Sequence, residues 1–160
     1  MAYRNTDRWR RKFRGARRYY RGLERRAARF SFDLSAGNWF DLHHTHFDWV
    51  GHGRRGTRHR RRHLTALFTA FRRVVDQARA SGRPLQVWLS VAADHEVEQD
   101  ALYLHSANPN GTPFPYPFSG VEWSVEVPPF LRDFVGDGSK EIGYLEYEGQ
   151  PQYVVRERGS

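Results

Sequence analysis

The sequence has no cysteine among its 160 residues, which excludes disulfide bonds and thiolate metal ligands. It has a single methionine, and no apolar run approaches the roughly 18 residues that a membrane-spanning helix needs. The first residues also lack the apolar segment of a secretory signal. We therefore expect a cytoplasmic protein without a membrane partner, whose fold is stabilised by packing alone.

Lysine is rare as well, because all but two of the 26 basic residues are arginines. Residues 1–83 carry 22 basic and 6 acidic residues, whereas residues 84–160 carry 4 and 12. Arginine forks bind phosphate and carboxylate, so the first half predicts a surface for a polyanion or an acidic protein. The alternative is that the two halves neutralise each other inside one fold.

Aromatic residues make up 15% of the chain, which argues for a packed core rather than disorder. The length fits a single domain over residues 1–160. The order of helical and strand-like segments predicts an α+β fold. We expect an antiparallel, possibly mixed, sheet of about six to seven strands with two main helices packed on one side. A basic amphipathic helix over residues 6–28 precedes an α+β body over residues 29–157.

The spacing of apolar residues predicts the two helices. In residues 6–28 these residues recur every three or four positions, and the faces between them are almost entirely arginine. The stripe consists of Trp9, Phe13, Ala16, Tyr20, Leu23 and Ala27. A second helix begins at Thr57, carries an apolar stripe from Leu64 to Ala78, and ends at Ser81-Gly82-Arg83-Pro84.

Alternation of apolar and polar residues predicts the strands. Residues 30–35 and 39–49 form a hairpin in this interpretation, and residues 85–92 and 101–106 form an antiparallel pair. Residues 121–127 form a strand with all its apolar side chains on one face. Residues 142–147 and 152–157 form a closing hairpin, and its acidic residues are natural internal partners for the arginines.

Six of the eight histidines lie between residues 38 and 63, which suggests a metal site. His44 and His46 lie two positions apart on a predicted strand, so their side chains point the same way, and Asp48 continues the row. His52 follows in the next turn. Imidazole and carboxylate groups are ligands for divalent metals such as zinc. The sequence therefore offers these four residues as candidate metal ligands.

Acid–base chemistry without a metal is an alternative for the same histidines. In that hypothesis His44, His46 and His105 are the candidate catalytic residues, acting on a phosphorylated substrate. A polar surface without chemistry is a third interpretation. The sequence contains no complete catalytic constellation, so it favours a protein that is not an enzyme, and no cofactor is predicted.

The start of the second helix predicts an anion site. Arginine and histidine crowd the first turns, where the helix dipole is already positive. Exposed backbone N–H groups, flexible glycines and arginine forks together suit a phosphate or a carboxylate. The predicted members are Arg54, Arg55, Thr57, Arg58, His59, Arg61 and Arg62. The competing occupants are acidic residues of the chain itself, from residues 94–100 or from the C-terminal strands.

Residues 107–120 form a long irregular loop in which prolines alternate with aromatic residues. Alternating prolines keep the backbone extended, so Phe114, Tyr116 and Phe118 project from it. Such a loop is either a lid over a site or a flap pinned onto the core.

These features predict a small non-catalytic binding protein whose arginine and histidine surface meets a negatively charged partner. RNA is one such partner, and an acidic protein, such as an effector that this protein inhibits, is another. The alternatives are a metal-dependent hydrolase using His44, His46 and Asp48, or a metal-free histidine enzyme. The sequence does not predict an oligomeric state.

Overall fold

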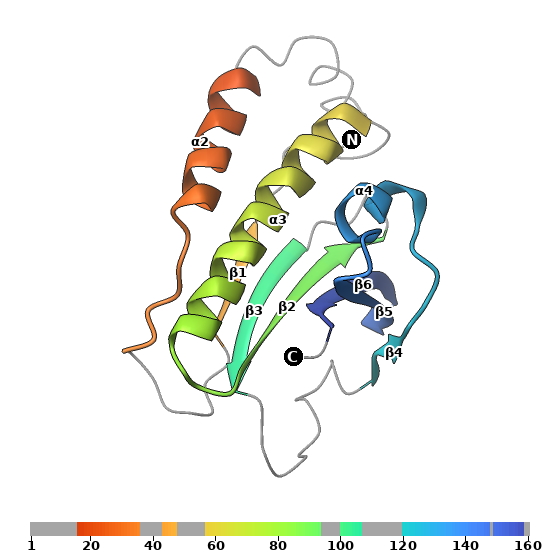
Figure 1. Ribbon diagram of the computed structural model, residues 1–160. Helices are drawn as coiled ribbons and strands as arrows, with labels where there is room; N and C mark the ends of the chain where they lie inside the picture. Colours follow the sequence, from red (N-terminus) through yellow and green to blue (C-terminus); the bar gives the residue numbers. More distant parts are fainter. Residues whose placement is uncertain are drawn as a thin grey trace.

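The computed structural model describes residues 16–35, 43–47, 57–93, 100–106, 120–147 and 149–158. Of residues 16, 43–47, 57–60, 106 and 147 it describes only the backbone. In chain order the elements are α2 (Ala16–Ala28), β1 (His43–Phe47), α3 (Thr57–Ala80), β2 (Leu85–Ala92), β3 (Asp100–Ser106), β4 (Glu122–Trp123), the 3-10 turn η2 (Pro129–Leu131), α4 (Arg132–Val135), β5 (Lys140–Tyr147) and β6 (Gln150–Glu157) (Figure 1).

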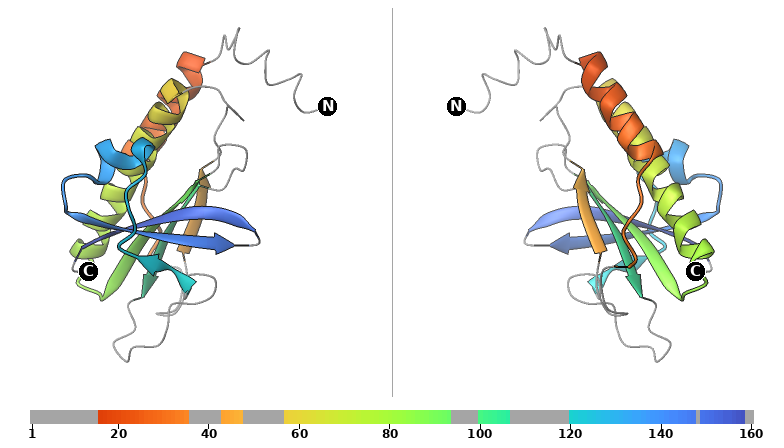
Figure 2. Two further views of the ribbon diagram at one scale, coloured as in Figure 1. Left: turned by 90° about the vertical axis from the view of Figure 1, so that its right-hand side faces the viewer. Right: turned by 90° about the vertical axis from the view of Figure 1, so that its left-hand side faces the viewer.

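The six strands form one sheet in the order β1-β3-β2-β6-β5-β4, and every neighbouring pair is antiparallel. The helix α3 crosses one face of this sheet, and α2 packs alongside α3 on the same side (Figures 1 and 2). The α+β class and the antiparallel sheet predicted from the sequence are confirmed. The β2–β3 and β5–β6 pairs also match the predicted pairs of strands.

The main core lies between the helices and the sheet. The predicted stripe of α3 is buried and consists of Leu64, Leu67, Phe68, Phe71, Val74, Val75 and Ala78. These side chains meet the alternating apolar residues of β2 and β3. Each fully buried side chain of this kind stabilises the fold by about 1.5 to 3 kcal/mol relative to exposure. In α2 the predicted stripe is likewise buried at Tyr20, Leu23 and Ala27. Residues 6–15 of this predicted helix lie outside the described residues.

The predicted hairpin between residues 30–35 and the histidine strand is wrong. Residues 30–35 are not a strand, and β1 pairs with β3 instead. The side-chain amide of Gln77, on α3, satisfies the backbone that a strand partner would have paired. The Phe32 N–H donates to Gln77 Oε1 at 3.0 Å, and Gln77 Nε2 donates to the Phe32 carbonyl. The alternation of apolar and polar residues in this segment therefore reflects an extended chain that is half-buried against the helix α3 and not a strand of the sheet.

The predicted strand over residues 121–127 is broken after two residues. Ser124 has a φ of 63°, and the N–H groups of Ser124 and Val125 both donate to the Ile142 carbonyl, at 2.9 and 3.3 Å. This bend resembles a β-bulge, which re-aims the residues that follow it. The apolar residues are therefore divided: Val121 and Trp123 pack with Trp88 on the sheet face away from the helices, and Val125 and Val127 join the main core.

Two glycines provide a matched test of this packing. A Cβ at Gly143 would collide with Val121 and press on Trp123, whereas a Cβ at Gly22, in α2, meets nothing within 4 Å. We expect Gly143→Ala to lower the free energy of unfolding by about 1 to 3 kcal/mol, the usual effect of overpacking. Gly22→Ala should raise it by about 0.5 to 1 kcal/mol, because alanine favours a helix. Urea denaturation measures both, and equal effects would contradict the packing of β4 on β5.

Candidate nucleic-acid interface

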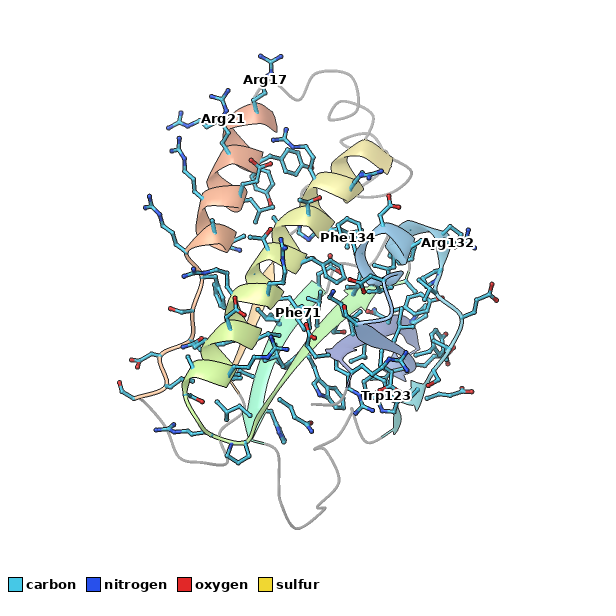
Figure 3. The ribbon with its side chains drawn as sticks, in the orientation of Figure 1. Arg17, Arg21, Phe71, Trp123, Arg132 and Phe134 are labelled. Atoms are coloured by element: carbon cyan, nitrogen blue, oxygen red, sulfur yellow. The ribbon has the colours of Figure 1, made fainter. Side chains whose placement is uncertain are left out.

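One side of α2 is covered with exposed arginines. The α2 arginine face consists of Arg17, Arg18, Arg21, Arg25, Arg26 and, directly after the helix, Arg29. In Figure 3 the side chains of Arg17 and Arg21 extend from α2 away from α3. The buried stripe occupies the opposite side of the helix, so packing against α3 forces the arginines outward.

The acidic residue of α2 does not neutralise this face. Glu24 is the only carboxylate in the helix, and its Oε1 accepts a hydrogen bond from Arg62 Nη2 of α3 at 2.9 Å. Within the described part of the chain five members of the α2 arginine face form no ion pair: Arg17, Arg18, Arg21, Arg25 and Arg29. A concentration of uncompensated positive charge attracts polyanions and raises their rate of association.

Arg62 also fixes the orientation of α2. Its guanidinium lies over the ring of Tyr20, 4.7 Å from the centroid, while the same group holds Glu24. A cation over an aromatic ring is attracted by the electron-rich face of that ring. Tyr20 is completely buried, and this burial, together with the neighbouring Tyr19, raises its pKa to about 12, although the positive charge of Arg62 opposes the shift.

The raised pKa of Tyr20 predicts a loss of stability in alkali. The folded state holds the phenolic proton more tightly than the unfolded state, whose pKa is near 10.0. The contribution is therefore complete below pH 10 and is lost as the pH rises from 10 towards 12. We expect it to reach about 2 to 3 kcal/mol. Urea denaturation of the wild type and of Tyr20→Phe isolates it, since their difference in unfolding free energy should change over this range. A constant difference, or the same change in Tyr19→Phe, would disprove the assignment.

The anion site predicted at the start of α3 is described only in part. Arg61 Nη2 lies 2.9 Å from Asp133 Oδ2, and Arg62 pairs with Glu24 as above. Carboxylates of the chain itself therefore meet both arginines whose side chains are described, but they come from α4 and α2 and not from residues 94–100 or the C-terminal strands. The Arg61–Asp133 pair is about two-thirds exposed on both sides, and such surface pairs contribute only about 0 to 1 kcal/mol. Of the other predicted members, Arg54 and Arg55 lie outside the described residues, and Thr57, Arg58 and His59 are described by their backbone alone.

A buried pair of His63 and Asp100 was not predicted from the sequence, where His63 was counted only as one of the six histidines between residues 38 and 63. The side chains of His63 and Asp100 are 0% and 3% exposed, and Nε2 of the histidine lies 2.9 Å from Oδ2 of the aspartate. Asp100 Oδ1 also accepts the N–H of Ala92 at 2.9 Å. A signal was present, because His63 stands four positions before Leu67 and so continues the apolar stripe of α3.

The metal and acid–base hypotheses remain predictions. His44 and His46 lie on β1, where only the backbone is described, and Asp48 and His52 lie outside the described residues. His105 is half-buried on β3, the strand beside β1. Among the side chains that the structure describes, no three histidine, aspartate or glutamate groups gather where they could hold one metal ion. The aromatic loop residues Phe114, Tyr116 and Phe118 also lie outside the described residues.

The described helices include none with the length and apolar character needed to cross a membrane. Comparison with protein-family models, with curated proteins and with solved structures finds no match to this chain. The fold and the site define an α+β protein with a basic helical face.

Proposed function

We propose that this protein is a non-catalytic nucleic-acid-binding protein whose α2 arginine face contacts the phosphate backbone. The observation that supports the proposal is the separation of charge on α2. Its single carboxylate is paired with Arg62 of α3, while the side chains of Arg17 and Arg21 extend away from α3. Arginine contacts phosphate through charge-assisted and often bidentate hydrogen bonds.

The spacing of the arginines suits a linear polyanion. Arg17, Arg21 and Arg25 follow one another every four positions, so they form one row along the helix, and Arg29 comes four positions later, directly after its end. Successive members of such a row are about 6 Å apart along the helix axis. Like charges four positions apart destabilise a helix by about 0.2 to 0.5 kcal/mol per pair, and bound phosphates relieve this repulsion. The row therefore favours a ligand with regularly repeated negative charges.

The composition of this face favours nucleic acid over an acidic protein. Besides the arginines, the exposed residues among the described side chains of α2, 17–28, are Gly22, Glu24 and Ala28, so this described part of the face has no large apolar side chain. Protein interfaces usually place aromatic or apolar anchors at their centre. Binding to a phosphate backbone needs no such anchor, because it is driven by charge and by the release of counterions. RNA and DNA share this backbone chemistry.

Fluorescence anisotropy tests the proposal with labelled single-stranded RNA, single-stranded DNA and poly-glutamate. We expect both nucleic acids to bind the full chain, with log–log salt slopes near −0.7 for each phosphate neutralised. A difference between the RNA and DNA arms identifies the polymer that is preferred. Equal or tighter binding of poly-glutamate, or nucleic-acid affinities that do not change with salt, would overturn the proposal.

A further inference from the structure

Gly22 lies halfway along α2 on its exposed side, where the described structure does not require a glycine. The backbone there is helical, and a Cβ at this position would meet no atom of the described residues within 4 Å. Neither an unusual conformation nor close packing therefore explains the residue. Glycine also makes a helix less stable than alanine does. A residue that weakens its own element without a structural reason is expected at a functional site, and glycine lets a ligand approach the backbone closely.

Two unpaired arginines stand on either side of Gly22. Arg18 precedes it by four positions and Arg25 follows it by three, so both are its neighbours on the helix surface. Both side chains are exposed, and neither forms an ion pair within the described residues. A ligand that approaches the backbone at Gly22 therefore passes between two guanidinium groups, which favours a ligand with negative charge on both sides.

The larger part of the circumference of α2 is exposed. Its fully or nearly buried residues, Tyr20, Leu23 and Ala27, occupy one narrow side, and α2 lies at the outer margin of the helical layer (Figures 1 and 2). An α-helix with its side chains is roughly 10–12 Å across. The major groove of B-form DNA is about 12 Å wide and admits a helix. The exposed side of α2 therefore has the dimensions to enter that groove.

We propose that α2 binds in the major groove of double-stranded DNA, with Gly22 at the point of closest approach and Arg18 and Arg25 meeting the phosphates on either side. This inference rests on the proposed nucleic-acid function and names the polymer. Double-stranded RNA fits less well, because the major groove of its A-form helix is deep and narrow. Proteins that bind single strands commonly stack the bases on aromatic side chains, and the exposed residues among positions 17–28 include no aromatic residue.

Fluorescence anisotropy tests the polymer with a labelled DNA duplex, the RNA duplex of the same sequence and the single DNA strand. We expect the full chain to bind the DNA duplex about tenfold more tightly than the RNA duplex, which carries the same number of phosphates. Equal or tighter binding of the RNA duplex or of the single strand would overturn the assignment to duplex DNA and leave the proposed function intact. Absence of binding to every nucleic acid would overturn both.

Gly22→Leu tests the close approach, and Ala80→Leu is its matched control, since Ala80 is exposed at the end of α3. Neither change alters the charge. We expect Gly22→Leu to weaken binding of the DNA duplex about tenfold, because the new side chain keeps the helix out of the groove, and Ala80→Leu to change it by less than about twofold. Leucine favours a helix over glycine, so Gly22→Leu should also raise the urea midpoint, which excludes unfolding as the cause. Unchanged duplex affinity in Gly22→Leu, or equal losses in the two variants, would contradict the proposal.

Discussion

Replacing Arg17, Arg21 and Arg25 together by glutamate is expected to lower the affinity for single-stranded RNA by about 100- to 1,000-fold. Exposed charge contacts contribute on the order of 1 kcal/mol each, and every reversal also adds repulsion towards phosphate, so the three changes together amount to about 3 to 4 kcal/mol. The free energy of unfolding should change by less than about 1 kcal/mol, because these side chains are exposed and form no ion pair within the described residues. Anisotropy measures the affinity, and urea denaturation measures the stability.

The matched control reverses three basic residues of the C-terminal half, Arg132, Lys140 and Arg158. Arg132 lies on α4, away from α2 (Figure 3). Both triple variants lower the net charge by the same amount. Comparing them therefore distinguishes binding through the α2 arginine face from attraction by the overall charge of the protein. The control should lose less than about tenfold in affinity, through long-range electrostatics alone. Equal losses in the two variants would mean that overall charge, and not the α2 arginine face, governs binding.

The second large effect is expected at the buried pair of His63 and Asp100. Asp100→Ala should lower the free energy of unfolding by about 2 to 4 kcal/mol, because removing a buried acceptor costs about 1 to 3 kcal/mol for each polar group that it leaves unsatisfied. The change also removes the carboxylate that accepts the N–H of Ala92, the last residue of β2. Asp100→Asn retains a similar shape and an oxygen for Ala92, so its cost should be smaller, about 1 to 2 kcal/mol.

A double-mutant cycle provides the control for this pair. Removing both side chains, in His63→Leu with Asp100→Leu, leaves neither member of the pair buried without the other and should cost less than the sum of the two single changes to leucine. The loss of the Ala92 hydrogen bond is common to Asp100→Leu and the double variant and so cancels in the cycle. The expected coupling is about 1 to 3 kcal/mol. Additive effects, or a loss below 1 kcal/mol for Asp100→Ala, would show that the 2.9 Å contact does not couple the two residues.

Features set by local spacing were predictable from the sequence. The stripe of α3, from Leu64 to Ala78, repeats at the helical period and is buried as expected. The arginine-covered side of α2 follows from the same reasoning, because Tyr20, Leu23 and Ala27 mark the opposite side. A residue pattern determines which side of a helix is apolar before any partner is known.

Contacts between distant residues were not predictable in this way. Nothing near Gln77 in the sequence indicates that its amide pairs with Phe32, which is 45 positions away. The bend at Ser124 likewise depends on the Ile142 carbonyl across the sheet. Arg62 is one of several neighbouring arginines, and only the packing of α2 on α3 selects it as the partner of Glu24. Tertiary context decides such cases, whereas alternation and charge give only a local tendency.

The most direct test of the account compares the salt dependence of RNA binding in the wild type and in the combined variant Arg17→Ala, Arg21→Ala and Arg25→Ala. If these arginines contact phosphates, the log–log slope should become less steep by about 2, because each lost contact removes roughly 0.7. The same alanine changes at Arg132, Lys140 and Arg158 should leave the slope unchanged. A slope in the α2 variant equal to that of the wild type would contradict the proposal that α2 binds the phosphate backbone.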